Sequence, residues 1–241
     1  MRQNRTALIS LAILLTVLSI FFYHGNIAEF PAHIHAWTQS DRYAIALGFL
    51  KNHFDFFHPQ TFNLNPDFAK TTYGIPTAIT AVDFPIHEYI IALLMNITGS
   101  SSPEIFRLYM LLYGCVGVFF LFLFVKKLTG STLAAFTMAI FTFTCPVLCY
   151  YQDGFLPSTT SLASIFIGIY FYYSYLTSGK KKVFLLWTSL SYVGSALPHT
   201  LYYISSRCRV HRVIYFFPKK KLECRKVNSI PGRVTFCFFL L

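Results

Sequence analysis

The sequence predicts an all-α polytopic membrane protein with one long loop on the outer face of the bilayer. Hydrophobic residues make up 55% of the 241 residues and charged residues only 12%, whereas a soluble domain carries about 25% charged residues. The mean hydropathy is +0.52. Apolar runs of about 20 residues, the length that crosses the hydrocarbon core of a bilayer, recur along the chain.

Residues 1–200 are expected to form a transmembrane module with five spans. The first follows a basic N-terminus, and no small-residue cleavage site comes after it, so we interpret it as a retained signal anchor rather than a signal peptide. The five predicted spans cover residues 6–23, 105–125, 132–151, 158–177 and 183–200.

Lysine and arginine predict the orientation of these spans, because both residues are enriched in cytoplasmic loops. Arg2 and Arg5 place the N-terminus in the cytoplasm. Lysine clusters at residues 126–127 and 180–182 fall on the same side if residues 24–103 form a single outer loop. The agreement of the three basic clusters supports this topology.

The outer loop is expected to carry two interfacial helices. Residues 38–54 have apolar residues at three- and four-residue spacing, with Asp41 expected in the first turn. Residues 84–98 are too short to span the membrane, and a span there would put both lysine clusters outside. The apolar face predicted for the first helix consists of Tyr43, Leu47, Leu50 and Phe54, and it is widened by Ile45 and Phe49.

Acids and histidines gather in the outer loop, which holds six of the nine acids and six of the eight histidines. No charged residue lies near the middle of a predicted span, which argues against an ion pathway. Polar groups above a membrane surface are more typical of a reaction site. The six acids are Glu29, Asp41, Asp55, Asp67, Asp83 and Glu88.

Asp41 is the candidate general base. A carboxylate at the membrane surface can remove a proton from an acceptor hydroxyl or amine as it attacks a sugar. The alternative is structural, because Thr38-x-x-Asp41 resembles a capping box with Asp in place of Glu. Asp153, in the second outer loop, is the second candidate acid, and its alternative is a simple turn over Gln152-Asp153-Gly154.

Five further residues are candidates for substrate binding. Asp83, His87 and Glu88 could hold a donor phosphate or an acceptor, although Asp83 could instead cap a helix and Glu88 complement its dipole. Arg42 and Arg107 are candidate phosphate ligands. Arg107 could instead be an interfacial residue whose charge reaches toward the headgroups.

No metal or cofactor is predicted. His33-Ile34-His35 is the strongest local metal signal, and a lone HxH pattern is weak evidence for a metal site. The six cysteines form no CxxC pair, and the outer loop contains none of them.

Three motifs together resemble a known family. HAWTQSDR at residues 35–42, DFPIHEY at 83–89, and Cys145-Pro146 followed by YYQD at 150–153 occur in this order. Their order and placement resemble the bacterial GT-C glycosyltransferases, in the family of protein O-mannosyltransferases and aminoarabinose–lipid A transferases. The resemblance covers roughly residues 1–200 and implies a GT-C-like module whose long outer loop bears interfacial helices.

The resemblance implies a sugar donor linked to polyprenyl phosphate, a lipid or protein acceptor, no cofactor, and a place in the bacterial inner (plasma) membrane. It implies that Asp41 is the catalytic base or orients the acceptor, and that Asp153 is a second site acid. It extends only loosely to Asp83 and His87. Many relatives have two adjacent acids in the first loop, whereas Arg42 follows Asp41 here.

Residues 201–241 form a basic tail that the predicted topology places outside, against the positive-inside tendency. Members of the family are also longer. We therefore expect a truncated or frame-shifted chain with a non-native tail, which would lack the donor pocket and be inactive. The alternative is a genuine tail that binds anionic lipid headgroups. Nucleic-acid binding is not expected, because the basic residues have no folded platform around them.

Two other functions remain open from the sequence alone. One is a non-enzymatic membrane subunit for assembly or transport that handles lipid-linked sugars. The other is a flippase or ligase that leaves the sugar–phosphate bond intact. A phenotype insensitive to Asp41→Ala would favour the non-enzymatic alternative.

Overall fold

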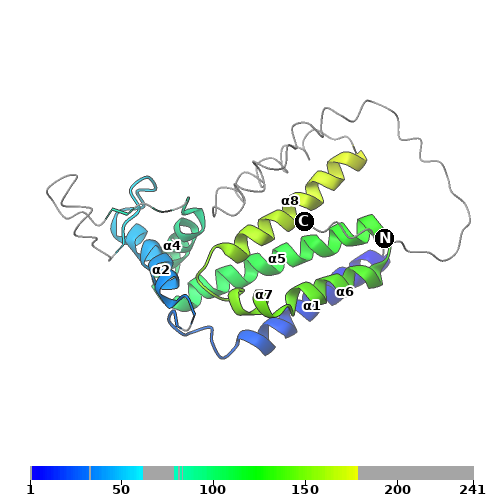
Figure 1. Cartoon of the computed structure of the whole chain (residues 1–241), viewed down its shortest axis with the longest axis horizontal. Helices are drawn as coiled ribbons and strands as arrows, with labels where there is room; N and C mark the ends of the chain where they lie inside the picture. The colour runs from blue at the N-terminus through cyan, green and yellow to red at the C-terminus, as the bar shows by residue number, and fades with distance from the viewer. Residues whose placement is uncertain (1, 33, 62–78, 81, 83, 179–241) are drawn as a thin grey trace, which may run out of the picture.

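The computed structural model describes residues 2–32, 34–61, 79–80, 82 and 84–178. Every helix or strand assigned in these residues is an α-helix, and the only strand-like feature is one isolated bridge between Gln60 and Ile79. Figure 1 shows α1, α5, α6 and α8 as an elongated bundle, with α2 and α4 gathered at one of its ends. The predicted all-α fold class is confirmed.

Two of the described helices are long and apolar enough to cross a membrane. They are α1 (Arg2–Tyr23), whose apolar segment is Arg5–Tyr23, and α5 (Pro103–Thr129). The start of α5 is well defined, because Ser102 accepts a hydrogen bond from the Glu104 N–H and Pro103 occupies the first turn. These helices coincide with the first two predicted spans.

The structure differs from the sequence prediction at residues 132–151, which form two helices rather than one. Helix α6 (Thr132–Phe143) ends at Phe143, and the short α7 (Pro146–Tyr151) begins after Thr144 and Cys145. Pro146 lacks an N–H and disfavours helical geometry in the residue before it. Cys145 accordingly has ψ near 125°, outside the helical range.

Helix α8 (Ser158–Ser178) covers the fourth predicted span. Its packing against α5 depends on a glycine, because a Cβ added at Gly117 would lie 2.5 Å from the Cα of Ala163. Small residues of this kind let two helix backbones approach closely. The fifth predicted span and the basic tail lie outside the described residues.

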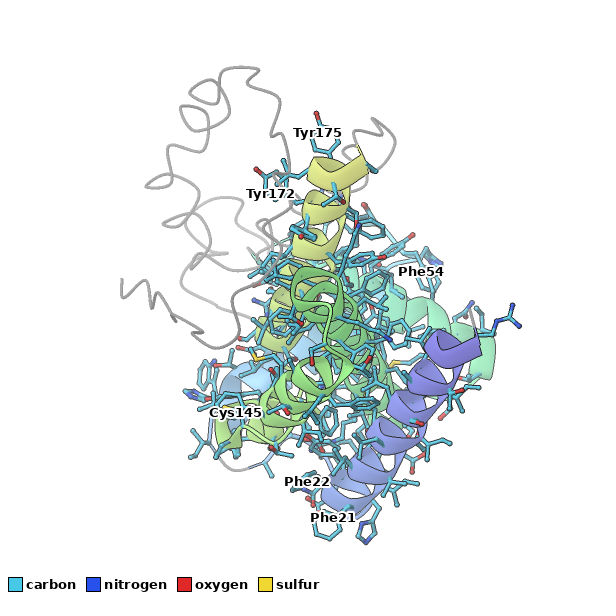
Figure 2. All side chains as sticks on the ribbon, turned by 90° about the vertical axis from the view of Figure 1, so that its right-hand side faces the viewer. Phe21, Phe22, Phe54, Cys145, Tyr172 and Tyr175 are labelled. Carbon is cyan, nitrogen blue, oxygen red and sulfur yellow. The ribbon has the colours of Figure 1, made fainter. Side chains whose placement is uncertain are left out.

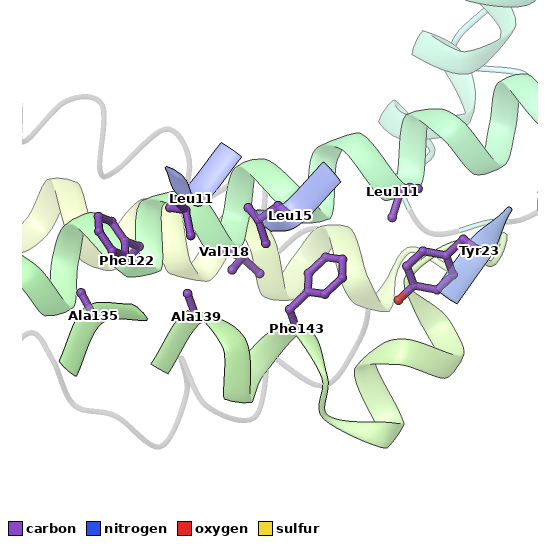
Figure 3. Close-up of a cluster of buried hydrophobic side chains, with 9 residues drawn as sticks. All are labelled: Leu11, Leu15, Tyr23, Leu111, Val118, Phe122, Ala135, Ala139 and Phe143. Atoms are coloured by element: carbon purple, nitrogen blue, oxygen red, sulfur yellow. The ribbon is translucent and has the colours of Figure 1, made fainter. Parts of the chain in front are cut away.

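The core of the bundle joins α1, α5 and α6. Figure 3 shows how leucines of α1 and the larger apolar side chains of α5 meet the small alanines of α6. Aromatic residues lie at the ends of the bundle; in Figure 2, the exposed Phe21 projects near the end of α1 and Tyr175 projects near the end of α8. The core residues include Leu11, Leu15, Val118, Phe122, Ala135, Ala139 and Phe143.

The two helices predicted within the outer loop are present as α2 (Ala36–Lys51) and α4 (Ile86–Thr98). They pack against each other, with Ile45 and Phe49 of α2 meeting Ala92 of α4 in a small core. The residues of the predicted apolar face all pack against two buried clusters. Tyr43 packs inward against the start of α5, and Phe54 packs against the small core from beyond the end of α2, where its φ is positive.

The predicted capping box at Thr38 is wrong. Helix α2 begins at Ala36, and its N-cap is His35 in a left-handed conformation without a side-chain capping bond. Thr38 therefore already lies inside the helix, and Asp41 lies beyond the first turn. A capping role does not account for Asp41 in this structure.

Candidate functional site

A buried ion pair joins α5 to the turn between α7 and α8. The Nη1 atom of Arg107 lies 3.3 Å from Oδ2 of Asp153, and the two side chains are only 8% and 7% exposed. The same Nη1 donates to the backbone carbonyl of Asp153 at 3.0 Å. Burial raises the pKa of the Asp153 carboxyl, and the neighbouring guanidinium opposes that shift.

Arg107 also holds the chain that follows α1. Its Nε donates to the carbonyl of Glu29 at 2.9 Å, and its Nη2 donates to the carbonyl of Phe30 at 3.3 Å. The guanidinium lies 4.8 Å from the ring centroid of Phe155. Since all three nitrogens donate to protein oxygens, the geometry favours an organising role for Arg107 over direct contact with a phosphate.

A polar cleft of about 260 Å³ lies beside this pair. Asp153 reaches it from a turn in which the Gly154 N–H donates to the Tyr151 carbonyl at 3.2 Å, so the turn predicted there is present and also places the acid in the cleft. The cleft is lined by Phe22, Tyr23, Asn26, Glu29, Ala32, Gln39, Arg107, Cys149, Tyr150, Asp153 and Gly154.

Gln39 links α2 to this cleft. Its Nε2 donates to the carbonyl of Ile34 at 3.1 Å, and its Oε1 accepts from the N–H of Phe155 at 3.4 Å. The sequence analysis did not single out Gln39 for any role. The sequence feature that could have identified Gln39 is its position one turn before Tyr43, where a polar residue lies on the buried face of an amphipathic helix.

A second ion pair joins α2 to α4. The Nη1 atom of Arg42 lies 3.2 Å from Oε1 of Glu88, with side-chain exposures of 14% and 2%. Glu88 lies in the first turn of α4, where a carboxylate also complements the helix dipole. The structure therefore brings together two of the residues predicted to bind substrate, although they are 46 positions apart in the sequence.

His87 is buried beside α5. Its Nδ1 lies 2.7 Å from the hydroxyl of Tyr109, whereas its Nε2 is buried and makes no hydrogen bond within the described residues. Burial lowers the pKa of His87 to about 4, which keeps the ring neutral near pH 7. A protonated His87 that neutralises a donor phosphate is therefore not favoured by this environment.

Asp41 is half-buried on α2 and does not line the polar cleft. It follows Gln39 by two positions, which is about 200° around a helix, so the two side chains leave α2 on nearly opposite sides. The structure thus does not bring Asp41 and Asp153 into one cleft. Asp83 and His33 lie outside the described residues, and within the described part of the chain no cluster of three potential metal ligands occurs.

Comparison with known families matches residues 82–197 to the family described as dolichyl-phosphate-mannose-protein mannosyltransferase. The matched range contains Glu88, Arg107 and Asp153, whereas Asp41 and Arg42 precede it. No curated protein and no solved structure matches the chain. The match supports glycosyltransferase activity in general and, with the two long apolar helices, association with a membrane.

Proposed function

We propose that the chain is a glycosyltransferase that moves a sugar from a polyprenyl-phosphate-linked donor to an acceptor at the outer face of a bacterial inner membrane. The observation that carries the proposal is the match of residues 82–197 to a family that transfers mannose from a lipid phosphate. That range supplies one residue of the Arg42–Glu88 pair and both residues of the Arg107–Asp153 pair.

The position of the polar groups suits this reaction. Helices α2 and α4 lie at the end of the bundle where α1 ends and α5 begins (Figure 1). A lipid phosphate presents its head at the bilayer surface, so a site built there meets the sugar without removing the lipid chain from the membrane. With the N-terminus in the cytoplasm, this end of the bundle faces outward.

In the proposed reaction Asp41 takes the proton of the acceptor hydroxyl or amine as its oxygen or nitrogen attacks the anomeric carbon. The bond between that carbon and the phosphate oxygen breaks, and the lipid phosphate leaves as an anion. Arg42 stabilises the leaving charge. A single displacement of this kind inverts the anomeric configuration.

The two buried pairs have different parts in this mechanism. The ion pair with Glu88 on α4 positions the guanidinium of Arg42. The Arg42 side chain stays partly exposed in this position. Arg107 and Asp153 organise the chain around the polar cleft, and Asp153 serves as the second acid of the site through this positioning role. His87 connects α4 to α5 through its hydrogen bond with Tyr109, and it contributes to substrate binding by positioning the first turn of α4.

The experiment that tests the function is a transfer assay with the purified full-length chain in liposomes. Polyprenyl phosphate carrying radiolabelled mannose serves as donor, and a membrane extract supplies the acceptors. The proposal predicts label in the acceptor fraction, and none when a nucleotide-linked sugar replaces the lipid donor. A folded protein that transfers no label from lipid donors carrying mannose or an aminopentose would overturn it.

A further inference from the structure

The side chain of Gln39 connects three separate segments of the chain. It is 6% exposed and lies on the buried side of α2. Its Nε2 donates to the carbonyl of Ile34, just before α2, and its Oε1 accepts from the N–H of Phe155, two positions after Asp153. The amide therefore uses both its donor and its acceptor groups within the protein, which fixes its orientation.

The start of α2 lacks the usual side-chain cap. His35 occupies the N-cap position in a left-handed conformation and makes no side-chain capping bond. The first N–H groups of a helix have no partner within the helix, so an end without a cap is less stable. The bond from Gln39 to the Ile34 carbonyl connects this end of α2 to the segment before it. The bond from Phe155 connects the same end to the residues beside Asp153.

One turn further along α2, Tyr43 contacts the same phenylalanine. The ring centroids of Tyr43 and Phe155 lie 5.5 Å apart in a T-shaped arrangement, and Phe155 is fully buried. Gln39 and Tyr43 are four positions apart, so they lie on one side of the helix. Together they hold that side of α2 against the turn that carries Asp153.

Asp41 lies between these two contacts in the sequence. It is two positions from Gln39 and two from Tyr43, which is about 200° around a helix, so its side chain leaves α2 on the opposite side. A rotation or a shift of the helix at Gln39 therefore moves the Asp41 carboxylate. Displacing a reacting group by about 1 Å can lower a rate by about 10²-fold, so the inward-facing amide controls a position that matters for catalysis.

We infer that Gln39 is a positioning residue of the reaction, which holds the start of α2 against residues 153–155 and thereby sets the position of the Asp41 carboxylate. The inference rests on the proposed function, in which Asp41 is the base. Gln39 exchanges no proton in this role and acts only through Asp41. The chain around Asp153 is the fixed surface against which α2 is held.

Hydrogen exchange of the full-length chain in nanodiscs tests the positioning without any sugar transfer. Gln39→Met keeps the length of the side chain and removes both hydrogen bonds. Exchange of the backbone amides of residues 39–43 should become faster by about fivefold, because these two bonds no longer hold the turn. Exchange within α5 should not change. Gln60→Met, which makes the same substitution in the outer loop beyond α2, is the matched control and should leave residues 39–43 as they are in the parent chain.

The liposome transfer assay separates positioning from general stability, with rates expressed per amount of folded protein. The kcat of Gln39→Met should fall by about tenfold to a hundredfold, and its KM for the donor should stay at the parent value because Gln39 contributes no uniform substrate binding. In the Asp41→Asn background the same substitution should have no further effect. Such non-additivity is expected of a residue that acts through another.

Unchanged exchange of residues 39–43 in Gln39→Met would overturn the inference, whatever the activity. Faster exchange without loss of kcat would also overturn it, as would an equal fractional loss of transfer in the parent and Asp41→Asn backgrounds, because a purely structural defect lowers both alike. These results leave the proposed function intact if the parent chain transfers sugar and Asp41→Asn does not. A folded parent chain that transfers no sugar would instead reject the proposed function, and with it the catalytic part assigned to Gln39.

Discussion

Arg107 donates two hydrogen bonds to Asp153: its Nη1 lies 3.0 Å from the backbone carbonyl oxygen and 3.3 Å from the carboxylate Oδ2. The side chain thereby fixes both the position of the turn and the direction of the acid. Because the same guanidinium binds the carbonyls of Glu29 and Phe30, one buried arginine connects the segments on both sides of the polar cleft.

Asp153→Asn is expected to destabilise the fold. The change leaves the buried Arg107 charge uncompensated, and loss of one partner of such a pair costs about 3 kcal/mol. Thermal unfolding in detergent measures the effect. Glu104→Gln is the matched control, because Glu104 is an exposed acid three positions before Arg107 on the same helix. Equal unfolding midpoints for the two variants would show that the Arg107–Asp153 pair does not stabilise the fold.

Gly117→Ala is expected to disrupt the contact between α5 and α8. The added methyl group would lie 2.5 Å from the Cα of Ala163, so a backbone must move. Overpacking of this kind costs about 1–3 kcal/mol, which outweighs the gain of up to about 1 kcal/mol from replacing glycine within a helix. Gly25→Ala is the control, since nothing lies within 4 Å of its added Cβ. A more stable Gly117→Ala protein would refute the packing argument.

Arg42 and Glu88 are expected to be energetically coupled. A double-mutant cycle with Arg42→Gln and Glu88→Gln should give a coupling free energy of about 1–3 kcal/mol, because the Glu88 carboxylate is almost wholly buried. Unfolding free energies of the four proteins supply the measurement. Additive effects of the two substitutions would show that the pair does not connect α2 with α4.

The sequence predicted the long elements of the fold better than the contacts between them. The apolar runs indicated α1, α5 and α8 because burial in lipid demands uninterrupted hydrophobic length. The break before α7 was missed, although Pro146 marks it. The beginning of α2 was placed two residues late, because Thr38 offers a familiar capping pattern whereas His35 adopts a left-handed conformation that no local rule signals.

The site was only partly predictable for a different reason. The charged residues were identified one by one, but each ion pair joins residues 46 positions apart, and nothing local encodes that pairing. Asp41 and Asp153 were expected to work as two acids of one site. The structure places Asp153 in the polar cleft and Asp41 outside its lining.

His87 is expected to make folding sensitive to acid. Its pKa is lowered from 6.5 to about 4 by burial, so the unfolded chain binds a proton more readily than the folded chain. The stability contributed by the neutral ring is complete above about pH 6.5 and is lost as the pH falls toward 4, with a slope of up to about 1.4 kcal/mol per pH unit.

His87→Asn should flatten that pH dependence, because asparagine does not titrate and can still bond the Tyr109 hydroxyl. Unfolding free energies measured between pH 4 and 7 compare the variant with the parent protein. His24→Gln removes an exposed histidine and should keep the parent slope. A parent slope retained in His87→Asn would mean that other groups cause the acid sensitivity.

The central claim is sugar transfer with Asp41 as base, and the most direct test compares the parent chain, Asp41→Asn and Asp55→Asn in the liposome transfer assay. Asp55 is an exposed acid of the same outer loop and serves as the matched control. General-base catalysis contributes about 10²–10⁴-fold, so transfer should fall by that factor in Asp41→Asn and stay unchanged in Asp55→Asn. Parent-level transfer by a folded Asp41→Asn protein would contradict the account.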